Sequence, residues 1–431
     1  MDVKSKNIQK FLFFVNKKKC PAEQIVSNRF LNDEPKIYSY TAILKKTNRL
    51  LKKGIANGYS FLKKEALLKC LGESLERYCL GVCPKKFVKD SYNDLKEKAV
   101  NPKDFCFFSK KDFQLKPKFR IDFNRRTKFN WVKGYSLIYK KRVFIPAQLV
   151  FVPYYYNKKE PRIRIPITTG AACYSSFKGA ILRGLLEVIE RDAFMISYLN
   201  KLQRKIVDIS KSRDKVFKKI TAIFKKYNLE LSIIDISTDI PVYSILAIVI
   251  DKTNLGPAVS LGLKSGLNIK RVIIGAVEES LQGRFWLREE MIKQRFKKTE
   301  KIFKALKRRK LINPIERGIF WSKTKIINKI DFFIKAKKIS FEKYPFKKIK
   351  KVDSLFYWFK KENIDVLYVD ITLPKIKRKN IYIVKVIVPT LQPLYLDERF
   401  PYWRGERLKS VPLKLGYKPL REINKFPHPF L

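Results

Sequence analysis

A five-residue pattern of charged side chains, Glu-x-x-Glu-Arg, occurs twice in the chain, at residues 73–77 and 187–191. Residues three and four apart lie on one face of a helix, so each copy would present two carboxylates and a guanidinium as a cluster. If the two helices face each other, four carboxylates converge, and their repulsion in a poorly solvated pocket would force some to protonate unless cations lie among them. Oxygen-rich sites of this kind suit Mg2+, which uses a few carboxylates together with substrate phosphates.

The alternative is a pair of ordinary intrahelical ion pairs, because Glu73 to Arg77 and Glu187 to Arg191 have the favourable spacing of four residues. Such pairs are common and contribute only about 0.3–0.5 kcal/mol each. Two copies in matching apolar contexts nevertheless favour a site.

Two apolar stretches with helical periodicity must position these clusters, one from about 62 to 80 and one from about 177 to 201. A third helix is expected over 268–293 and a short one over 353–361. Runs rich in β-branched and aromatic residues predict strands, at 131–137, 143–151, 230–236, 242–250, 258–263, 364–372 and 381–388. This mixture predicts an α/β fold of the mixed α+β kind.

The chain divides by composition into three parts. Residues 1–40 are basic and irregular and are interpreted as an N-terminal arm, 41–400 as the folded body, and 401–431 as a proline-rich tail that ends Phe-Pro-His-Pro-Phe-Leu. With 431 residues and 45% hydrophobic content, the chain can bury a large core.

The net charge and the length of the apolar runs bear on where the protein is located in the cell and whether it binds nucleic acid or a membrane. The formal net charge is +56, but the lysines are spread along the whole chain. The denser basic runs at 304–310, 347–351 and 375–379 lack interleaved aromatics, so they are interpreted as solvated surface, with nucleic-acid binding as the minority alternative. No apolar run approaches the roughly 18 residues that span a bilayer. We therefore expect a cytoplasmic protein without membrane contact.

Cysteine and histidine usage excludes several chemistries. The C-x3-C pair Cys79 and Cys83 could form half of a zinc site with Cys20 or Cys106, but the second pair is missing, so six free thiols are expected. The only histidine, His428, lies three residues from the end, which excludes an internal histidine base. A glycine-rich phosphate loop is also missing, so a nucleotide site would need carboxylates, metals and arginines.

Together these motifs resemble the YcaO proteins, specifically the cyclodehydratase branch that makes thiazoline and oxazoline rings in ribosomal peptides. The likeness runs from about residue 58 to the C-terminus. Its motifs are Glu73-x-x-Glu-Arg-Tyr78, Trp131-x-x-Gly-Tyr-Ser136, Pro146-Ala-Gln-Leu-Val150, Ala180-Ile-Leu-x-Gly-Leu-Leu-Glu-x-Ile-Glu-Arg-Asp-Ala193, Glu279-x-x-Gln-x-Arg284, Val384-Lys-Val-Ile-Val-Pro389 and Asn424-x-x-Pro-His-Pro-Phe430.

The resemblance implies an ATP- and Mg2+-dependent enzyme with a YcaO fold. In that chemistry a Cys, Ser or Thr side chain of a peptide attacks the preceding backbone carbonyl, the oxyanion is phosphorylated from ATP, and phosphate leaves to give an azoline. Some relatives use external sulfide to make thioamides. The resemblance also implies a precursor peptide, a separate protein that recognises its leader, and a homodimer.

Site residues follow from the resemblance by position. It implies metal ligands at Glu73, Glu76, Glu187 and Glu190. It implies nucleotide contacts at Arg77, Arg191, Gln282 and Arg284, with Lys69 and Ser175 as further candidates. It implies that the tail enters the active site, with catalytic roles for Pro427, His428 as a proton acceptor, Pro429 and the terminal Leu431. Prolines would stiffen such a tail and fix the position of its last carboxylate.

Four departures from the family pattern stand out. Gly58-Tyr59-Ser60 replaces Gly-Lys-Gly, so a phosphate-contacting lysine is missing, and Lys69 takes a position that relatives usually fill with serine. Tyr174-Ser175-Ser176 replaces Gly-Asn-Ser/Thr, and Gly179 stands where relatives carry a metal carboxylate. Lys69 or Lys178 could restore positive charge at the phosphates. The alternative is a weakened enzyme or a scaffold that docks a partner without turnover.

Overall fold

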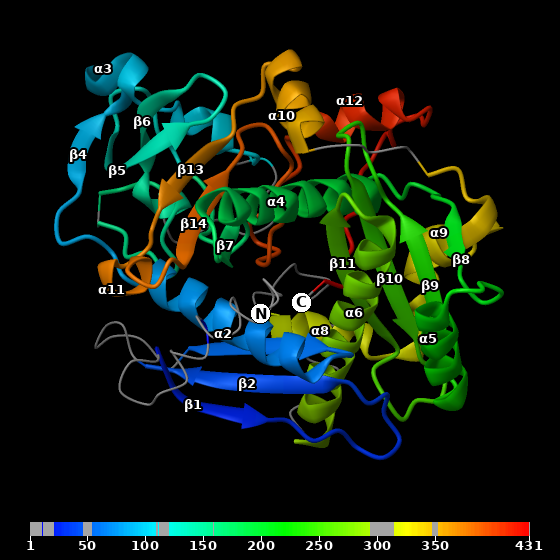
Figure 1. Ribbon diagram of the computed structural model, residues 1–431. Coiled ribbons are helices and arrows are strands. Elements are labelled where there is room, and N and C mark those ends of the chain that lie inside the picture. The colour runs from blue at the N-terminus through cyan, green and yellow to red at the C-terminus, as the bar shows by residue number, and fades with distance from the viewer. Residues whose placement is uncertain are drawn as a thin grey trace.

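The structure is a computed structural model that describes residues 11, 21–45, 54–108, 111, 120–157, 159–293, 314–346 and 352–430. Figure 1 shows three sheets with helices packed between and around them. The longer helices are α2 (Lys63–Leu80), α4 (Phe177–Leu199), α5 (Lys215–Lys226), α6 (Ile269–Ile292), α8 (Pro314–Trp321), α10 (Val352–Lys361) and α12 (Arg407–Lys414). Single-turn helices are α3 (Tyr92–Leu95), α9 (Asp331–Ile334) and α11 (Pro374–Lys377), and 3-10 segments cover Lys96–Lys98, Pro102–Phe105, Ala147–Leu149, Thr324–Ile330 and Phe341–Lys343.

A three-stranded antiparallel sheet carries helix α2. Its strands are β1 (Ala22–Ser27), β2 (Tyr38–Leu44) and β3 (Ile55–Ser60), in that order. Helix α2 buries its face of small and apolar residues, including Ala66 and Cys70, against this sheet. The approach is so close that a Cβ on Gly58 would lie 2.1 Å from the carbonyl oxygen of Ala66, which explains why this strand position is glycine.

A second sheet packs against α4 through its strands β14 and β7. Its order is β4 (Val88–Ser91), β5 (Lys128–Ser136), β13 (Leu367–Asp370), β14 (Tyr382–Ile387) and β7 (Ala171–Tyr174), with β6 (Lys141–Pro146) also paired to β5. Strands β13 and β14 come from late in the chain, so this sheet joins segments about 200 residues apart. Strand β7 runs into α4, whose first turn is capped by the Ser176 hydroxyl accepting from the Gly179 N–H.

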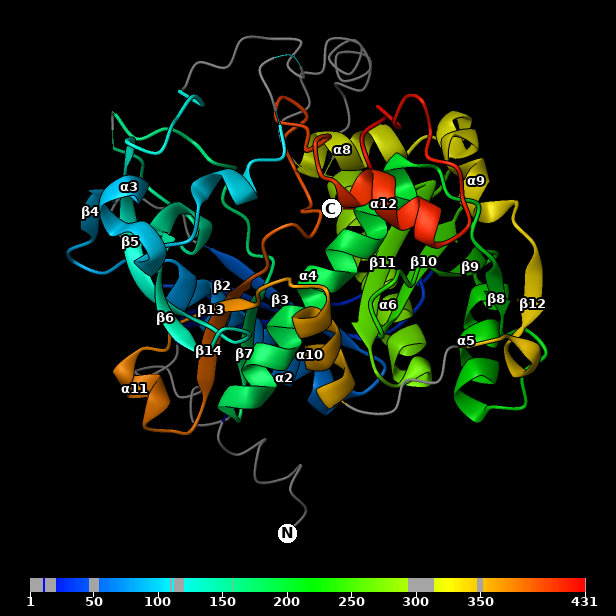
Figure 2. The same ribbon diagram turned by 90° about the horizontal axis from the view of Figure 1, so that it is seen from above.

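The third sheet is sandwiched between α4 and α6. Its order is β11 (Val259–Gly266), β10 (Tyr243–Ile250), β9 (Glu230–Asp235), β8 (Ile206–Asp208) and β12 (Lys338–Ser340), and only the β8–β12 pair is parallel. Alternate residues of β10 point to opposite faces: Leu246 and Ile248 join the core with α4, whereas Ile245 and Val249 join the core with α5 and α6. Both views place α4 centrally, with the C-terminal end of the chain beside α8 (Figures 1 and 2).

Most predicted elements are confirmed to within a few residues, including the three long helices and the strands after residue 130. The expectation of an irregular arm over residues 1–40 is wrong for the part that the structure describes, because β1 and the start of β2 lie there and a boundary at residue 40 would cut β2.

The basic runs at 304–310 and 347–351 lie outside the described residues, as do Cys20 and Leu431. No helix of the described chain has the length and apolarity needed to cross a bilayer.

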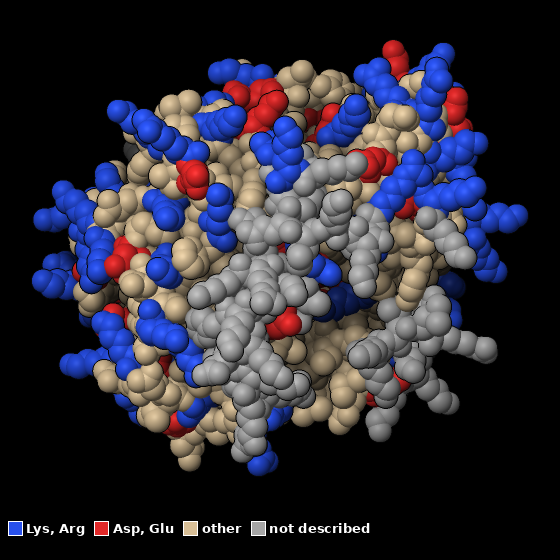
Figure 3. Space-filling model, turned by 180° about the vertical axis from the view of Figure 1, so that it is seen from behind, with Lys and Arg blue, Asp and Glu red and all other residues tan. Residues whose placement is uncertain are grey.

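The positive charge does not gather into one patch on the face shown in Figure 3, where Lys and Arg side chains are scattered between neutral residues. This distribution agrees with the interpretation of the lysines as solvated surface.

Candidate active site

Helix α4 presents the second Glu-x-x-Glu-Arg cluster to the junction between the second and third sheets. The Glu187 carboxylate accepts a hydrogen bond from the Gly170 N–H at 3.0 Å, just before β7. The buried Glu190 accepts from the Ser265 N–H of β11 at 2.8 Å. Both carboxylates are therefore fixed by backbone donors of the sheets on either side of α4.

Helix α2 presents the first cluster to the same junction. The Glu73 carboxylate accepts from the Asn57 N–H at 3.0 Å and pairs with Arg77 at 2.6 Å. The partly buried Glu76 accepts from the Cys173 N–H of β7 at 2.6 Å. Strand β7 thus lies between the two helices, with α2 and α4 both packed on it. The two copies of the motif meet at one strand, the arrangement that the sequence alone leaves as an assumption.

Glu279 of α6 extends this acidic line. Its carboxylate accepts from the Leu263 N–H at 2.6 Å and lies 3.8 Å from Arg191. We call Glu73, Glu76, Glu187, Glu190 and Glu279 the carboxylate row. Arg191 is its buried counter-ion, since its guanidinium is 2.7 Å from Glu190 and 3.5 Å from Glu187.

The carboxylates of the row interact electrostatically with one another. Burial, together with the charges of Glu73 and Glu187, raises the pKa of Glu76 to about 8. Burial also raises the pKa of Glu190 to about 7, although the Arg191 charge opposes the rise. Part of the row is therefore protonated at neutral pH unless a cation joins it, as expected for carboxylates that share one poorly solvated site.

The oxygen ligands of the row fit Mg2+ that is also bound by phosphate and water oxygens. Glu76 has one oxygen on the Cys173 N–H, and its other oxygen accepts no hydrogen bond within the described residues. Both Glu187 oxygens have a donor, the Gly170 N–H and, at 3.5 Å, Arg191, but each carboxylate oxygen has a second lone pair for a ligand. Within the described chain, no three acidic, His or Cys side chains are close enough to hold an ion alone. Mg2+ commonly takes one or two carboxylates plus phosphate and water oxygens. Glu76 and Glu187 are the residues best placed to hold it.

The predicted nucleotide-contacting residues divide into two groups. Arg77 and Arg191 lie in the row. Arg284 does not, because its buried guanidinium is bound to Glu34 at 2.6 Å and to Asp251 at 2.8 Å, where it joins α6 to the β1–β2 loop. Gln282 is half-buried on α6, one turn beyond Glu279. Its contact with nucleotide, like that of Arg284, stays a prediction.

The structure also describes Lys69 and Ser175, the two further candidates for phosphate contact. Lys69 donates to Glu278 at 2.5 Å and to the Tyr59 carbonyl at 3.0 Å, so its charge is already neutralised by an acidic partner. Ser175 is half-buried in the connection from β7 to α4. Tyr59, which replaces the family lysine, is buried with its ring against Phe285. Lys69 therefore does not simply replace the missing lysine.

The proline-rich tail reaches the row through Phe430. Its ring lies under the Arg191 guanidinium, with 4.1 Å from Cζ to the ring centroid. The carbonyl of Pro427 accepts from Tyr198 and from Trp321, each at 2.9 Å, which fixes the tail against α4 and α8. The predicted approach of the tail to the acidic cluster agrees with this geometry, while Leu431 lies outside the described residues.

His428 is placed in the core rather than facing the row. Its ring is fully buried among Phe194, Tyr198 and Tyr395, and Nε2 is 2.6 Å from the Tyr395 carbonyl, which requires that nitrogen to carry the proton. Burial and the Arg317 charge hold the pKa of His428 well below its usual range, so the ring is neutral. This environment gives His428 and the buried Pro429 a packing role, and their catalytic roles stay predictions.

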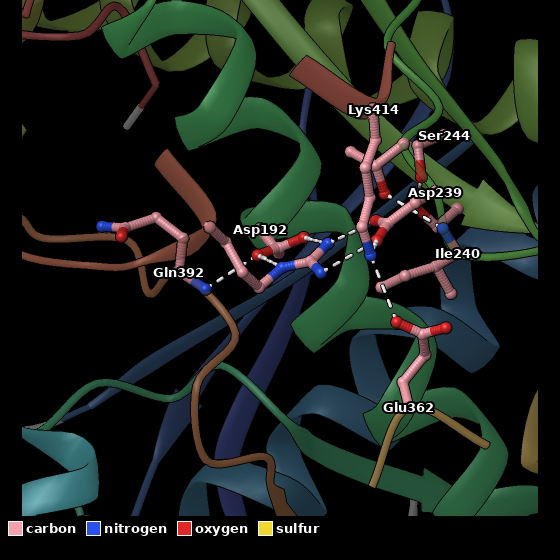
Figure 4. A network of polar contacts seen from close by, with 10 residues as sticks. Asp192, Asp239, Ile240, Ser244, Glu362, Gln392 and Lys414 are labelled. Atoms are coloured by element: carbon pink, nitrogen blue, oxygen red, sulfur yellow. Dashed lines mark hydrogen bonds and ion pairs between the residues drawn. The ribbon is translucent and has the colours of Figure 1, made fainter. Parts of the chain in front are cut away.

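A buried network next to the row anchors the tail to α4 (Figure 4). The Asp192 carboxylate, adjacent in sequence to Arg191, accepts from Arg407 Nε at 2.9 Å and Nη2 at 2.8 Å, and from the Gln392 N–H at 2.7 Å. Arg407 also pairs with Asp239 at 2.8 Å, and Lys414 bridges Asp239 and Glu362. The network holds α12, and with it the start of the tail, against the middle of α4, next to the residues of the row.

Lys385 fixes the turn that holds Glu187. Its buried ammonium donates to the Ile167 carbonyl at 2.7 Å and to the Thr169 carbonyl at 2.6 Å, immediately before Gly170. Burial and the nearby Arg164 lower the pKa of Lys385 to about 7. A lysine so desolvated is costly to charge, and its two carbonyl partners account for its place at the base of the row.

An aromatic ring covers the backbone at Gly179. A Cβ at Gly179 would lie 2.1 Å from Cδ1 of Tyr174, so any side chain there would collide with the ring that precedes α4. The Tyr174 ring thus occupies the space that a side chain at residue 179 would need.

Gly179→Ala is therefore expected to lower the free energy of unfolding by about 1 kcal/mol, since overpacking typically costs about 1–3 kcal/mol and the gain in helix propensity offsets part of it. In a Tyr174→Ala background the same substitution should destabilise less, because the contact with the ring is gone and only the 2.7 Å approach of the new Cβ to the Ser176 hydroxyl remains. Urea unfolding of the four proteins measures both effects. An equal effect of Gly179→Ala in the two backgrounds would show that the ring does not fill this space.

Comparison with known proteins decides the family. The sequence model of the YcaO cyclodehydratases, described as ATP- and Mg2+-binding, matches residues 57–392. The chain belongs to the YcaO family. An uncharacterised protein of Methanothermobacter thermautotrophicus is 27% identical over 162 residues, which cover 37% of this chain and 42% of the relative.

Solved YcaO structures share the fold. A heterocyclase in complex with substrate and cofactor superposes with a TM-score of 0.78 at 19% identity, covering 98% of this chain and 56% of that one. YcaO from Methanopyrus kandleri, bound with AMPPCP and Mg2+, gives 0.63 at 14% identity over 91% and 92% of the two chains. The E. coli microcin synthetase McbBCD complex gives 0.61 at 15% identity, over 85% and 87%. The chain thus spans about half the length of the heterocyclase, and the predicted mixed α+β YcaO fold is confirmed.

Sequence reasoning missed several residues that build the site. Glu279 was visible only as part of a motif, although its place on the predicted third helix, next to Glu278, was a usable signal. The pairing of Asp192 with Arg407 joins residues 215 positions apart, which no local pattern reveals. Lys385 was a single polar residue within an apolar strand, and such residues need a buried partner.

Proposed function

We propose that this YcaO protein is an ATP- and Mg2+-dependent cyclodehydratase that forms azoline rings from Cys, Ser or Thr in a ribosomal precursor peptide. The observation that supports it most is the carboxylate row, built by two Glu-x-x-Glu-Arg helices around strand β7 with the tail's Phe430 on Arg191. Acidic metal ligands and a buried arginine supply the positioning and the positive charge that phosphoryl transfer requires.

In the proposed reaction, a peptide Cys, Ser or Thr side chain attacks the preceding amide carbon. The resulting oxyanion takes the γ-phosphoryl group, and its C–O bond then breaks as phosphate leaves, so the peptide loses the elements of one water molecule and ATP becomes ADP. Bound Mg2+ would neutralise the charge that develops on the phosphate oxygens.

The chain's own residues supply position and charge. Glu76 and Glu187 would hold the metal, and each is oriented by a backbone N–H donor. Arg191 opposes the protonation of Glu190, because an opposite charge at 2.7 Å favours the charged carboxylate. Tyr198 and Trp321 fix the carbonyl of Pro427, so that the tail approaches the row in one conformation.

Incubation of the protein with ATP, Mg2+ and short Cys/Ser/Thr-rich peptides encoded beside its gene tests the proposal. We expect a loss of 18 Da per ring by mass spectrometry, coupled to phosphate release, and no loss without ATP. Sulfide-dependent replacement of an amide oxygen by sulfur would instead identify a thioamide-forming YcaO protein. A leader-recognition partner and homodimerisation belong to the same proposal, and pull-down with the precursor and light scattering test them.

A second candidate is a YcaO scaffold that binds a peptide without turnover. The observations that favour it are the buried Tyr59 in place of a lysine and the blocked position at Gly179. Calorimetric binding of Mg-ATP that Glu187→Ala removes would count against this scaffold.

A further inference from the structure

Arg183 is an exposed arginine on the same face of α4 as Glu187, one turn earlier in the helix. Its guanidinium lies over the ring of Tyr174, with 4.5 Å from Cζ to the ring centroid. Within the described chain it makes no hydrogen bond or ion pair. The side chain is thus held by stacking alone, which leaves its N–H donors unpaired.

The fold places Arg183 beside the row. Its guanidinium lies on the ring of Tyr174, which directly follows Cys173, and the Cys173 N–H donates to Glu76 at 2.6 Å. Glu187 lies one helical turn beyond Arg183 on the same face of α4. Arg183 is therefore close to Glu76 and Glu187, the two carboxylates that would hold the metal.

Arg183 differs in this respect from three other cations near the row. Arg77 is paired with Glu73, Arg191 with Glu190, and Lys69 with Glu278. A guanidinium without an acidic partner, pre-oriented on an aromatic ring beside a metal-binding carboxylate pair, has the geometry for an incoming polyanion.

The absence of a pair with Glu187 is also explained by the contacts. Glu187 is the residue four positions on, but one of its oxygens accepts from the Gly170 N–H and the other faces Arg191. The order Arg before Glu is moreover the less favourable one along a helix. Tyr174 therefore holds Arg183 in place of an acidic neighbour.

We propose that Arg183, oriented by Tyr174, binds the phosphate oxygens of the nucleotide at the Glu76–Glu187 end of the carboxylate row. This inference rests on the proposed ATP-dependent function. It gives Tyr174 a positioning role and gives Gly179 the role of making room for the ring. The tyrosine and glycine that depart from the family pattern then serve nucleotide binding through a different residue.

Calorimetric titration with Mg2+ and a non-hydrolysable ATP analogue tests this role. Arg183→Ala is expected to weaken binding of the triphosphate about tenfold or more, as for loss of a charge-assisted hydrogen bond, and to leave adenosine binding unchanged. Tyr174→Leu should weaken triphosphate binding less, and the double variant should be no weaker than Arg183→Ala, because the ring acts only through the arginine. Tyr174→Phe keeps the ring and should bind as the unaltered protein does.

Lys219→Ala is the control, since it removes an equal charge from an exposed residue of α5, a helix that carries no residue of the carboxylate row. Equal triphosphate affinity of Arg183→Ala and the unaltered protein would overturn the proposal while leaving the proposed function intact. Failure of the unaltered protein to bind the Mg2+–nucleotide would overturn both.

Discussion

Replacing Glu76 by glutamine is expected to lower ATP-dependent turnover by at least about a hundredfold, the scale of effect seen when one preorganised electrostatic contact is removed from an active site. Glutamine keeps the size of the side chain, and its amide oxygen can still accept the Cys173 N–H. The fold should therefore survive while the negative charge that holds Mg2+ is lost. Steady-state phosphate release with a precursor peptide measures the effect.

The same substitution should make the metal-free protein more stable at pH 8. The pKa of Glu76 is raised from 4.5 to about 8 in the folded chain, so its contribution to stability is fully present below pH 4.5 and is lost as the pH rises towards 8. Glutamine cannot ionise, so the variant should not lose this contribution to stability as the pH rises. Urea unfolding between pH 5 and 9 should show a shallower decline for Glu76→Gln, and adding Mg2+ and nucleotide should reduce the decline of the unaltered protein.

Glu65→Gln is the control, because Glu65 is an exposed glutamate in the first turn of the same helix. It should change neither turnover nor the dependence of stability on pH. Unchanged turnover in Glu76→Gln would contradict the assignment of Glu76 as a metal ligand, whereas an unchanged pH dependence would contradict its environment in the row.

How much of the site the sequence predicts depends on whether each feature is local. Helices α2 and α4 and their Glu and Arg faces follow from periodicity alone, because a repeat of three and four residues fixes which side chains share a face. The two faces meet at strand β7. The backbone of this strand donates a hydrogen bond to Glu76, and the strand ends a few residues before α4 begins. This pairing was an assumption at the level of sequence.

Other features are set by partners distant in the chain. Arg284 belongs to a motif that predicts nucleotide contact, yet its partner Glu34 lies 250 residues earlier, in the segment interpreted as an arm. Strand β1 was missed because its residues, with charged Glu23 and exposed Val26, lack a clean alternation, and its pairing with β2 decides the structure instead. The burial of His428 likewise depends on aromatic residues of three separate segments.

Arg407→Met should have the largest effect on stability, a loss of about 3–5 kcal/mol in the free energy of unfolding. Its guanidinium is the cationic partner of the fully buried Asp192 and of Asp239, and removing one side of a buried ion pair leaves an uncompensated charge. Burial already raises the pKa of Asp192 against the opposing charge of Arg407. Without Arg407 the carboxyl should protonate more readily, so the deficit should narrow as the pH falls towards about 4, near the ordinary pKa of aspartate.

Urea unfolding at pH 5 and pH 8 measures both parts of this prediction, and Lys414→Met provides the control. Lys414 belongs to the same network, but its side chain is 48% exposed, so its loss should cost less than about 1 kcal/mol. Asp192→Asn introduced into Arg407→Met should recover part of the stability, because a neutral amide costs less to bury than an unpaired carboxylate. Arg407→Met no less stable than Lys414→Met would mean that the network is not what anchors the tail segment to α4. The placement of Phe430 on Arg191 would then have to depend on the contacts of Pro427 with Tyr198 and Trp321 alone.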